Sequence, residues 1–407
     1  MLVEYNPLLP EHQLDPYPTY DRLRTHDPVH FSEIFRAWVV SRHADVSALL
    51  RDPRFGSDRH NSDLIHASPL PPVREDLQPL ADALKRNLLF SDPPDHTRVR
   101  ALVAKAFTPA KVDGHRGRIQ SLVDEAFARA DVDGGFDFVR DLADPMPVMV
   151  VAELLGLPPS QHRQFKVWSE EIGALLDPFV PHAAIDPAQA SARDMFRFFQ
   201  EVFADRRRRP RDDLIGTLVD AESRGEIRDE LELFATCALL LGAGHQTTTN
   251  LLGNAVHALL QYPDQRARLA THPDLMATAI EEFLRYESPV QVTARIANAD
   301  YSLHGKTMAR GDFVIVLLGS ANRDPAEFVD ADRLDVGRRI NRHLAFSTGV
   351  HACVGALLAR LEAETTISTL LRRFPRVSPA SEWSDWKPMV ISRGLNSLPL
   401  RLHGAPR

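Results

Sequence analysis

One cysteine, Cys353, stands among small residues in the segment 346–355, which reads F-S-T-G-V-H-A-C-V-G. The glycines at positions 349 and 355 allow the backbone to approach a flat cofactor closely. A helix-like run starts at Gly355, and backbone N–H groups at the start of a helix can hydrogen-bond a thiolate and keep it ionised. A cysteine taken alone is more often a buried structural residue, but these neighbours favour a thiolate that binds heme iron.

A second candidate stretch, residues 239–252, reads L-L-L-G-A-G-H-Q-T-T-T-N-L-L. Gly242 and Gly244 interrupt an otherwise good helix, and three threonines follow. Because glycine and threonine both weaken helical hydrogen bonding, we expect a locally opened turn against which a small ligand or water can sit. Taken alone, the stretch would more often be a core helix softened by glycine.

The segment 346–355 resembles the heme-binding loop of the cytochrome P-450 superfamily, where a phenylalanine, two glycines, a basic residue and the ligand cysteine recur in this order. The resemblance implies that Cys353 is the proximal ligand of the iron of heme b. Ser347 departs from the pattern because a glycine is usual there, and we expect it to tune the site. The loop residues that the resemblance assigns to cofactor binding are Phe346, Gly349, His351, Cys353 and Gly355.

The same resemblance places the glycine-threonine stretch in the oxygen-binding groove of the family's long central helix. Ala243, Gly244 and Thr247 match the family pattern, but Gln246 stands at the position of the usual acid. A carboxylate can relay protons, whereas a neutral amide can only orient water and donate a hydrogen bond. We therefore expect slower or rerouted proton delivery, with Thr247 positioning water and His245 a weaker candidate for the relay.

A third motif, A-I-E-E-F-L-R-Y at 279–286, resembles the E-x-x-R pair of the family and assigns it to Glu282 and Arg285. The i, i+3 spacing puts both side chains on one helical face. Such a pair alone is almost always a weak surface pair, but the family gives it a buried structural role. The resemblance implies Arg333 as the third member of this network.

The two heme propionates need cations or hydrogen-bond donors, and the resemblance supplies them. His96 and Arg100 are one helical turn apart, so both can face one carboxylate. Arg295 and His351 complete the set. Alignment to the motifs also gives a set of residues that line the substrate pocket: Leu239, Gly242, Ala243, Gln291, Thr293 and Ile391. The space left by Gly242 favours a substrate bulkier than a monoterpene.

The elements that must position these residues are mostly helical. Helix-period segments dominate, with short strand signals near 29–41 and 301–317 and an apolar helix over 231–260. Residues 57–90 read as a long irregular connection, which is more often a binding lid than filler. The resemblance implies a mainly α fold with small β-sheets, a single domain over residues 1–407, and heme held between the central helix and the helix after the cysteine loop.

Composition narrows the classes of function. The net charge of −7 gives no general attraction to nucleic acid. The first residues do not combine a basic start with a sustained apolar run, so we expect neither a secretory signal nor a membrane anchor. With two cysteines, a disulfide framework is excluded, so we expect a cytoplasmic protein and a packing role for Cys237. A zinc site is disfavoured because close pairs of histidines or thiols are lacking.

The motifs, taken together, predict the function of the protein. We expect a monooxygenase that uses O2 to hydroxylate or epoxidise a hydrophobic terpenoid, steroid, fatty acid or polyketide. No Walker loop or dinucleotide fingerprint occurs, so NAD(P)H electrons must arrive through a ferredoxin and its reductase, or a flavodoxin, and the protein is expected to be a monomer. A peroxide-driven or oxidative-coupling enzyme and a non-catalytic heme protein remain as alternatives. The arginines expected to dock the partner are Arg100, Arg338, Arg339 and Arg342.

Overall fold

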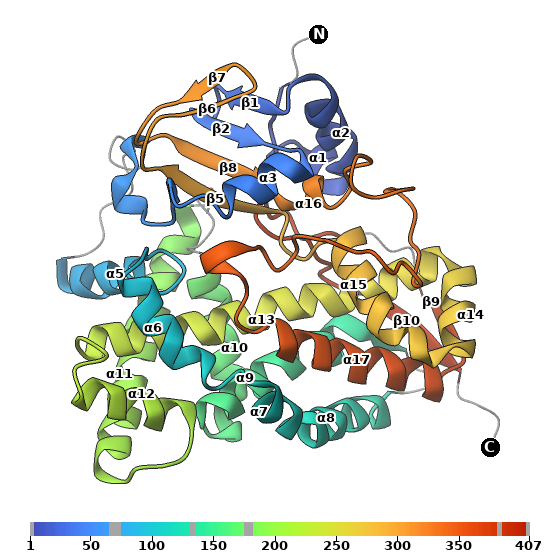
Figure 1. Cartoon of the computed structure of the whole chain (residues 1–407). Helices are drawn as coiled ribbons and strands as arrows, with labels where there is room; N and C mark the ends of the chain where they lie inside the picture. Colours follow the sequence, from blue (N-terminus) through green and yellow to red (C-terminus); the bar gives the residue numbers. More distant parts are fainter. Residues whose placement is uncertain (1–3, 65–74, 131–134, 175–181, 381–384, 404–407) are drawn as a thin grey trace.

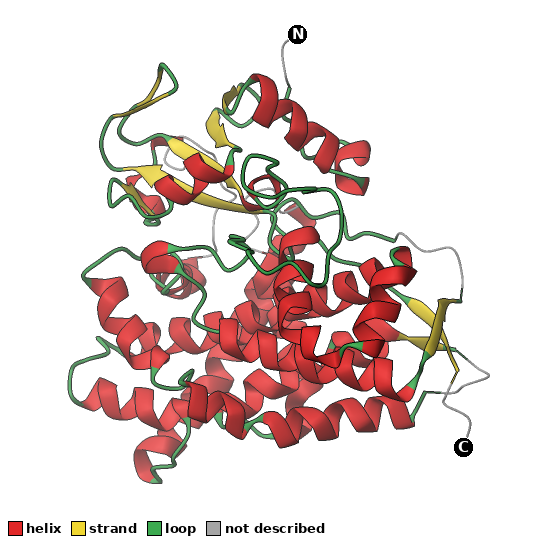
Figure 2. Ribbon diagram, turned by 45° about the vertical axis from the view of Figure 1, so that its right-hand side comes forward, coloured by secondary structure: helices red, strands yellow, loops and turns green. Residues whose placement is uncertain are grey.

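A computed structural model describes residues 4–64, 75–130, 135–174, 182–380 and 385–403. Helices form the larger part of the molecule, and the strands gather at its upper left and right edges in the view of Figure 2. The predicted mainly α fold with small β-sheets is therefore confirmed. None of the helices in the described segments is both long and apolar enough to cross a membrane.

The helices carry most of the buried apolar side chains. In chain order they are α1 (Pro10–Leu14), α2 (Tyr17–His26), α3 (His43–Leu49), α5 (Gln78–Lys85), α6 (Asp95–Ala104), α7 (Pro109–Gly114), α8 (Arg116–Ala128), α9 (Pro145–Leu155), α10 (His162–Ala174), α11 (Ile185–Arg208), α12 (Leu214–Ser223), α13 (Glu230–Gln261), α14 (Pro263–Thr271), α15 (Met276–Tyr286), α16 (Leu318–Ala321) and α17 (Ala356–Arg373). Figure 1 shows their arrangement. Helix α5 corrects the prediction of an irregular connection over 57–90, of which residues 65–74 lie outside the described part.

In the described part of the chain the strands form three sheets, of which the largest has the order β1-β2-β8-β5-β3. The strands are β1 (Val29–Ser32), β2 (Ala37–Val40), β3 (Phe55–Gly56), β4 (Phe136–Asp137), β5 (Val292–Ala297), β6 (Tyr301–Leu303), β7 (Lys306–Met308), β8 (Phe313–Leu317), β9 (Arg376–Pro379) and β10 (Pro399–His403). The strands expected near 29–41 and 301–317 are confirmed. Strand β8 is buried along its whole length, because alternate side chains pack toward α3 on one face and α2 on the other.

Helix α13 is the long central helix (Figure 1). It begins where the carboxylate of Asp229 accepts a hydrogen bond from the backbone N–H of Glu232 at 2.9 Å, an N-cap that satisfies one free donor of the first turn. It packs against α9, α10, α15 and α17 and buries Cys237 in the core, as predicted. The helix runs unbroken, which corrects the expectation that the glycines interrupt it.

Candidate active site

Helix α13 is buried on nearly all sides between Leu233 and Leu259, with one accessible patch. The residues in this span that are not buried are Leu239, Gly242, Ala243, Gly244, Gln246 and Thr247. Leu239, Ala243, Gln246 and Thr247 have the spacing i, i+4, i+7 and i+8, which places them on one helical face. The hydroxyl of Thr247 donates to the carbonyl oxygen of Ala243 at 2.8 Å. We call these six residues the α13 patch.

Gly244 has a packing role in addition to its place in the patch. A Cβ atom at this position would lie 2.5 Å from Cγ2 of Val151 on α9, closer than carbon atoms can approach. Glycine therefore lets α9 and α13 pack closely. No such constraint applies to Gly242, where an added Cβ would meet no described atom within 4 Å.

His245 is fully buried and points away from the α13 patch, toward α10 and the start of α9. Its Nδ1 atom lies 3.0 Å from the hydroxyl of Ser169, and its Nε2 atom lies 3.0 Å from Oδ1 of Asp144. Burial opposes ionisation of Asp144, but hydrogen bonds from His245 and Lys166 outweigh it and hold its pKa at about 2. His245 thus links α13 to Ser169 on α10 and to Asp144 at the start of α9, and we call this set of hydrogen bonds the His245 clasp. Because both ring nitrogens are used there, His245 is a poor proton relay.

The cysteine loop forms a tight turn before α17. The backbone N–H of Cys353 donates to the carbonyl oxygen of Phe346 at 2.9 Å. Burial raises the pKa of the Cys353 thiol, while hydrogen bonds from the backbone N–H groups of Gly355 and Ala356 and the charge of Arg100 lower it. Cys353 is nevertheless accessible to solvent. A side chain that is both accessible and desolvated lies on a concave surface, where a bound molecule can reach it.

Backbone conformation explains two small residues of the loop. Gly349 has φ +73°, and a Cβ there would lie 2.5 Å from the carbonyl oxygen of Leu50, so only glycine fits. Ser347 also lies in the left-handed region, with φ 57°. A glycine would adopt this conformation without strain, which gives a physical reason why glycine is usual there.

Four basic side chains converge beside the cysteine loop from three different segments. The rings of His96 on α6 and His351 have centroids 4.3 Å apart. Burial, followed by the charges of His351 and Arg100, lowers the pKa of His96 to about 4, and burial lowers that of Arg295 to about 10. Among the described residues, the carboxylate of Asp92 acts on His96, Arg295 and His351, and its Oδ1 atom lies 3.7 Å from Nε2 of His351.

The basic cluster of His96, Arg100, Arg295 and His351 contains polar atoms that have no hydrogen-bond partner. Both ring nitrogens of His96 and Nε2 of His351 are buried without a hydrogen-bond partner. Arg100 uses one N–H to hold the carbonyl oxygen of Ala352 at 2.6 Å, which fixes the cysteine loop to α6. Buried donors are seldom left unpaired in proteins. The cluster therefore fits an anionic group such as a carboxylate of a cofactor.

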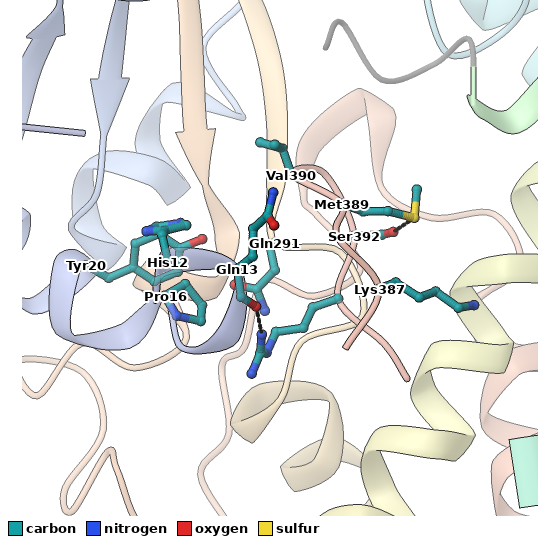
Figure 3. A pocket seen from close by; sticks show the side chains of 10 residues that line it. His12, Gln13, Pro16, Tyr20, Gln291, Lys387, Met389, Val390 and Ser392 are labelled. Carbon is teal, nitrogen blue, oxygen red and sulfur yellow. Dashed lines mark hydrogen bonds between the residues drawn. The ribbon is translucent and has the colours of Figure 1, made fainter. Parts of the chain in front are cut away.

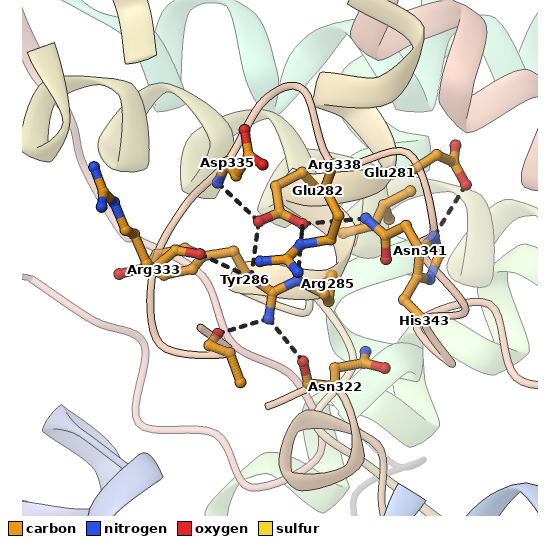
Figure 4. A network of polar contacts seen from close by, with 12 residues as sticks. Glu281, Glu282, Arg285, Tyr286, Asn322, Arg333, Asp335, Arg338, Asn341 and His343 are labelled. Atoms are coloured by element: carbon orange, nitrogen blue, oxygen red, sulfur yellow. Dashed lines mark hydrogen bonds and ion pairs between the residues drawn. The ribbon is translucent and has the colours of Figure 1, made fainter. Parts of the chain in front are cut away.

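The E-x-x-R pair lies at the centre of a buried polar network (Figure 4). Both side chains have no exposed surface, and the guanidinium of Arg285 donates two hydrogen bonds of 2.8 Å to Glu282. The remaining N–H groups donate to the carbonyl oxygens of Asn322, Ala331 and Arg333 at 2.7–3.1 Å. Arg285 thus ties α15 to the segment before the cysteine loop.

The third side chain of this network is Arg338, which corrects the expectation for Arg333. Nε of Arg338 donates to Oε2 of Glu282 at 2.9 Å, whereas Arg333 contributes only its carbonyl oxygen and turns its exposed side chain away (Figure 4). The physical reason is that Arg338 follows the turn at Asp335 and Gly337, which returns the chain to α15. Arg338 is therefore unavailable for docking a partner, while Arg339 and Arg342 are exposed.

A further ion-pair cluster, not anticipated from the sequence, supports the cysteine loop. Glu281 accepts two hydrogen bonds from Arg360 on α17, at 2.6 and 2.8 Å, and one from His343 at 3.0 Å. The guanidinium of Arg360 lies over the ring of Phe346, 4.7 Å from its centroid. The sequence contained one signal for this cluster, which is that Glu281 stands next to Glu282. Side chains of adjacent residues on a helix point in different directions, so the two carboxylates contact different neighbours.

Of the remaining residues predicted to line the substrate pocket, Gln291 and Ile391 lie next to each other. The backbone N–H of Gln291 donates to the carbonyl oxygen of Ile391 at 2.8 Å, and both Ile391 and Thr293 are half-buried. The amide of Gln291, however, donates to the carbonyl oxygen of Ser288 at 2.8 Å. It lines a small pocket with residues of α1 and the segment 387–393 (Figure 3), and no residue of the α13 patch lines that pocket.

The fold and the site together define an oxidoreductase of the heme-thiolate type, and comparison with known proteins agrees. The family model "Cytochrome P450" matches residues 71–392. The biotin biosynthesis cytochrome P450 of Bacillus subtilis (strain 168) is 36% identical over 389 residues, which cover 95% of this chain and 96% of that protein. The cytochrome P450 monooxygenase PikC of Streptomyces venezuelae is 39% identical over 400 residues, with 95% and 91% covered.

Solved structures give the same result. The crystal structure of CalO2 matches with a TM-score of 0.91 and 34% identity over 99% of this chain and 100% of that one. P450BioI, in complex with an acyl carrier protein ligated to hexadec-9Z-enoic acid, matches with a TM-score of 0.89 and 35% identity over 97% and 100%. The chain belongs to the cytochrome P450 family and is a monooxygenase that uses heme iron and O2.

The residues of the site fit a heme. The thiol of Cys353 is accessible and desolvated, and the basic cluster with its unpartnered ring nitrogens can hold the two propionates. A Cβ at Gly355 would meet only the ring of Phe107, at 3.8 Å, among the described atoms. The glycine therefore leaves room beside the thiol that a flat ring can occupy.

Proposed function

We propose that the protein inserts one oxygen atom into a hydrophobic small molecule, with Cys353 as the iron ligand and the heme held between α13 and α17. The observation that carries this proposal is the α13 patch: six residues are accessible on an otherwise buried helix, and they are the ones that the motif singled out. A buried helix has no structural need for such a patch. An accessible, desolvated thiol at the start of α17 supplies the complementary half of the site.

Each side chain has a stated task in this proposal. When bound, the heme supplies O2 activation, and the thiolate of Cys353 promotes O–O cleavage. His96, Arg100, Arg295 and His351 hold the propionates by charge and hydrogen bonds. Thr247, whose hydroxyl now donates to Ala243, can turn to hold water in the groove.

The substrate that we propose is an apolar chain or ring system, and fatty acyl and polyketide compounds are the first to test. The support comes from relatives of this chain. One is named for polyketide biosynthesis, another was crystallised with a fatty acyl carrier protein, and two others were crystallised with testosterone and myristic acid. Leu239 and Gly242 on the α13 patch, with Thr293 and Ile391, are the proposed lining.

Electrons are proposed to come from NAD(P)H through a ferredoxin and its reductase, or a flavodoxin, in the cytoplasm. Arg339 and Arg342 are the arginines of the expected docking set that stay exposed. Arg339→Glu should slow reduction by ferredoxin severalfold at low salt, and the difference should shrink as salt rises, because steering by charge is screened. Arg197→Glu on α11, where Arg197 is 69% exposed, is the matched control and should leave the rate unchanged.

The experiment that tests the central assignment is the absorption spectrum of the dithionite-reduced protein with carbon monoxide. A strongly red-shifted Soret band, absent from Cys353→Ser, is expected for thiolate ligation. A band typical of histidine ligation in both proteins would refute it. Titration with fatty acids and polyketide intermediates, followed by the spin-state change of the heme, would then identify the substrate class.

Gln246 specifically favours a second function, a peroxide-driven reaction, because peroxide brings its own protons and electrons. Supplying hydrogen peroxide instead of NAD(P)H and redox partners separates the two. Faster product formation with peroxide would support the second function. Product labelled from 18O2 only in the presence of the partners would support the first.

A further inference from the structure

A cation from α17 lies against the cysteine loop. The guanidinium of Arg360 lies over the ring of Phe346, with its central carbon 4.7 Å from the ring centroid. The carbonyl oxygen of Phe346 in turn accepts the hydrogen bond from the backbone N–H of Cys353 at 2.9 Å. A guanidinium within about 6 Å of an aromatic centroid is attracted to the face of the ring. The charge of Arg360 is therefore held next to the turn that carries the thiol.

Glu281 on α15 fixes the direction of this guanidinium. Nε of Arg360 donates to one carboxylate oxygen of Glu281 at 2.6 Å, and Nη2 donates to the other oxygen at 2.8 Å. A planar pair with two parallel hydrogen bonds fixes orientation as well as distance. The side chains of Arg360 and Glu281 are 35% and 28% exposed, so water screens their charges only in part.

His343 completes this arrangement as a neutral ring. Its Nδ1 atom accepts a hydrogen bond of 3.2 Å from the backbone N–H of Ala345 and therefore carries no proton. The proton is on Nε2, which donates to Glu281 at 3.0 Å (Figure 4). The charge of this cluster thus consists of one cation, Arg360, and one anion, Glu281, and the cation is the member that lies over Phe346 of the cysteine loop.

The charge of Arg360 reaches the thiol. Burial raises the pKa of the Cys353 thiol, while backbone N–H groups at the start of α17 and the charges of Arg100 and Arg360 lower it. The effect is mutual, since hydrogen bonds to Glu281 raise the pKa of Arg360 and the charge of Cys353 raises it further. Arg100 belongs to the basic cluster, where a bound propionate would offset its charge. Among the described residues, the carboxylate that offsets the charge of Arg360 is that of Glu281.

We propose that Arg360 raises the reduction potential of the heme that Cys353 holds, and that Glu281 limits this effect by offsetting part of the charge. This inference rests on the proposed role of Cys353 as the iron ligand. Reduction adds one negative charge to the unit of heme and thiolate, and a nearby cation stabilises the more negative form. The electron comes from the reduced redox partner, which is oxidised in the same step, so no further reactant is needed. Arg360 and Glu281 act through the thiolate, so they are positioning residues rather than catalytic ones.

The test is the midpoint potential of the heme-loaded protein, measured by spectroelectrochemical titration without substrate or turnover. Arg360→Gln removes the cation and should shift the reduction equilibrium about tenfold toward the oxidised form, which is about 59 mV for one electron. Glu281→Gln removes the anion but can still accept a hydrogen bond from Arg360, so the potential should rise. Arg360→Lys keeps the charge and should stay closer to the parent than Arg360→Gln does.

Opposite shifts in the two glutamine variants are the decisive result, because a purely structural role of the ion pair would move both potentials in the same direction. Arg373→Gln is the matched control. Arg373 is the last residue of α17, its side chain is 41% exposed, and it lies 4.0 Å from a carboxylate oxygen of Asp124. Its replacement should leave the potential unchanged. Any combination other than a fall in Arg360→Gln and a rise in Glu281→Gln would overturn the proposal.

A second measurement follows the thiolate itself. A thiolate that donates more charge to the iron lets the iron donate more to bound carbon monoxide, which lowers the C–O stretching frequency. In the infrared spectrum of the reduced protein with carbon monoxide, Arg360→Gln should therefore lower this frequency and Glu281→Gln should raise it. Equal frequencies in the parent and both variants would overturn the proposal.

The outcomes also separate this inference from the function on which it rests. A parent protein that lacks the red-shifted carbon monoxide band contradicts Cys353 as the iron ligand. A parent that has this band, with variants whose potentials equal its own, contradicts only the role of Arg360. If Arg360→Gln does not bind heme, Glu281→Gln decides the matter, and a potential that does not rise in that variant would overturn the proposal.

Discussion

The network around Glu282 gives the sharpest test of the structure, because it assigns different roles to two nearby arginines. We expect Arg338→Ala to destabilise the protein strongly and Arg333→Ala to leave its stability nearly unchanged. The carboxylate of Glu282 accepts hydrogen bonds from Arg285, Arg338, Asn341 and the backbone N–H of Asp335. Arg333 offers the network only a backbone carbonyl, which alanine retains.

The magnitude follows from burial. The side chain of Arg338 is 11% exposed and that of Glu282 is 0% exposed, so the bond between them is a charge-assisted hydrogen bond away from water. Its loss should cost about 2–3 kcal/mol, a large share of the roughly 5–15 kcal/mol that stabilises a typical folded protein. The exposed guanidinium of Arg333 should contribute less than about 0.5 kcal/mol.

The assay is urea-induced unfolding of the heme-loaded protein, followed by Soret absorbance and tryptophan fluorescence. Arg338→Lys keeps the charge but loses the planar donor geometry, so its stability should fall between those of the parent and Arg338→Ala. The reasoning is refuted if Arg333→Ala loses as much stability as Arg338→Ala. Equal heme content in the parent and Arg333→Ala is the accompanying expectation.

Three further outcomes are expected. Ser347→Gly should raise the free energy of unfolding by up to about 1 kcal/mol in urea titrations, since glycine adopts φ 57° without strain. Glu281→Gln should make the free energy of unfolding depend less on pH in the acid range. Burial opposes ionisation of Glu281, but hydrogen bonds from Arg360 and His343 outweigh it and lower its pKa from 4.5 to about 2. The ionised carboxylate therefore stabilises the fold above pH 4.5, and this stabilisation is lost as the pH falls toward about 2. Equal slopes of unfolding midpoint against pH in the parent and the variant would contradict this. Gln246→Glu should raise product per NAD(P)H, and no change would show that the relay bypasses this position.

The sequence predicted the features that depend on local pattern. The fold class, the long central helix and the strands near 29–41 and 301–317 follow from periodicity and from motifs with fixed spacing. The i, i+3 pair of Glu282 and Arg285 forms as expected, because a helix fixes that geometry.

What could not be predicted depends on contacts between distant segments. The turn at Asp335 and Gly337 decides that Arg338 rather than Arg333 reaches Glu282, and no residue pattern reveals that choice. Similarly, the pairing of Glu362 with Thr248 depends on how α17 is rotated against α13. Local spacing predicts which residues share a face, but not which neighbour that face meets.

The clasp made by His245 restricts how the chain can change in length. Its bonds to Ser169 and Asp144 fix the rotation of α13, while Asp229 fixes where the helix starts. Deleting one residue between these two points would turn everything after it by about 100° relative to the cap. Either the clasp would break or the cap would be lost. Residues 230–244 therefore tolerate neither insertions nor deletions, so homologous helices should keep the same length between the cap and the histidine.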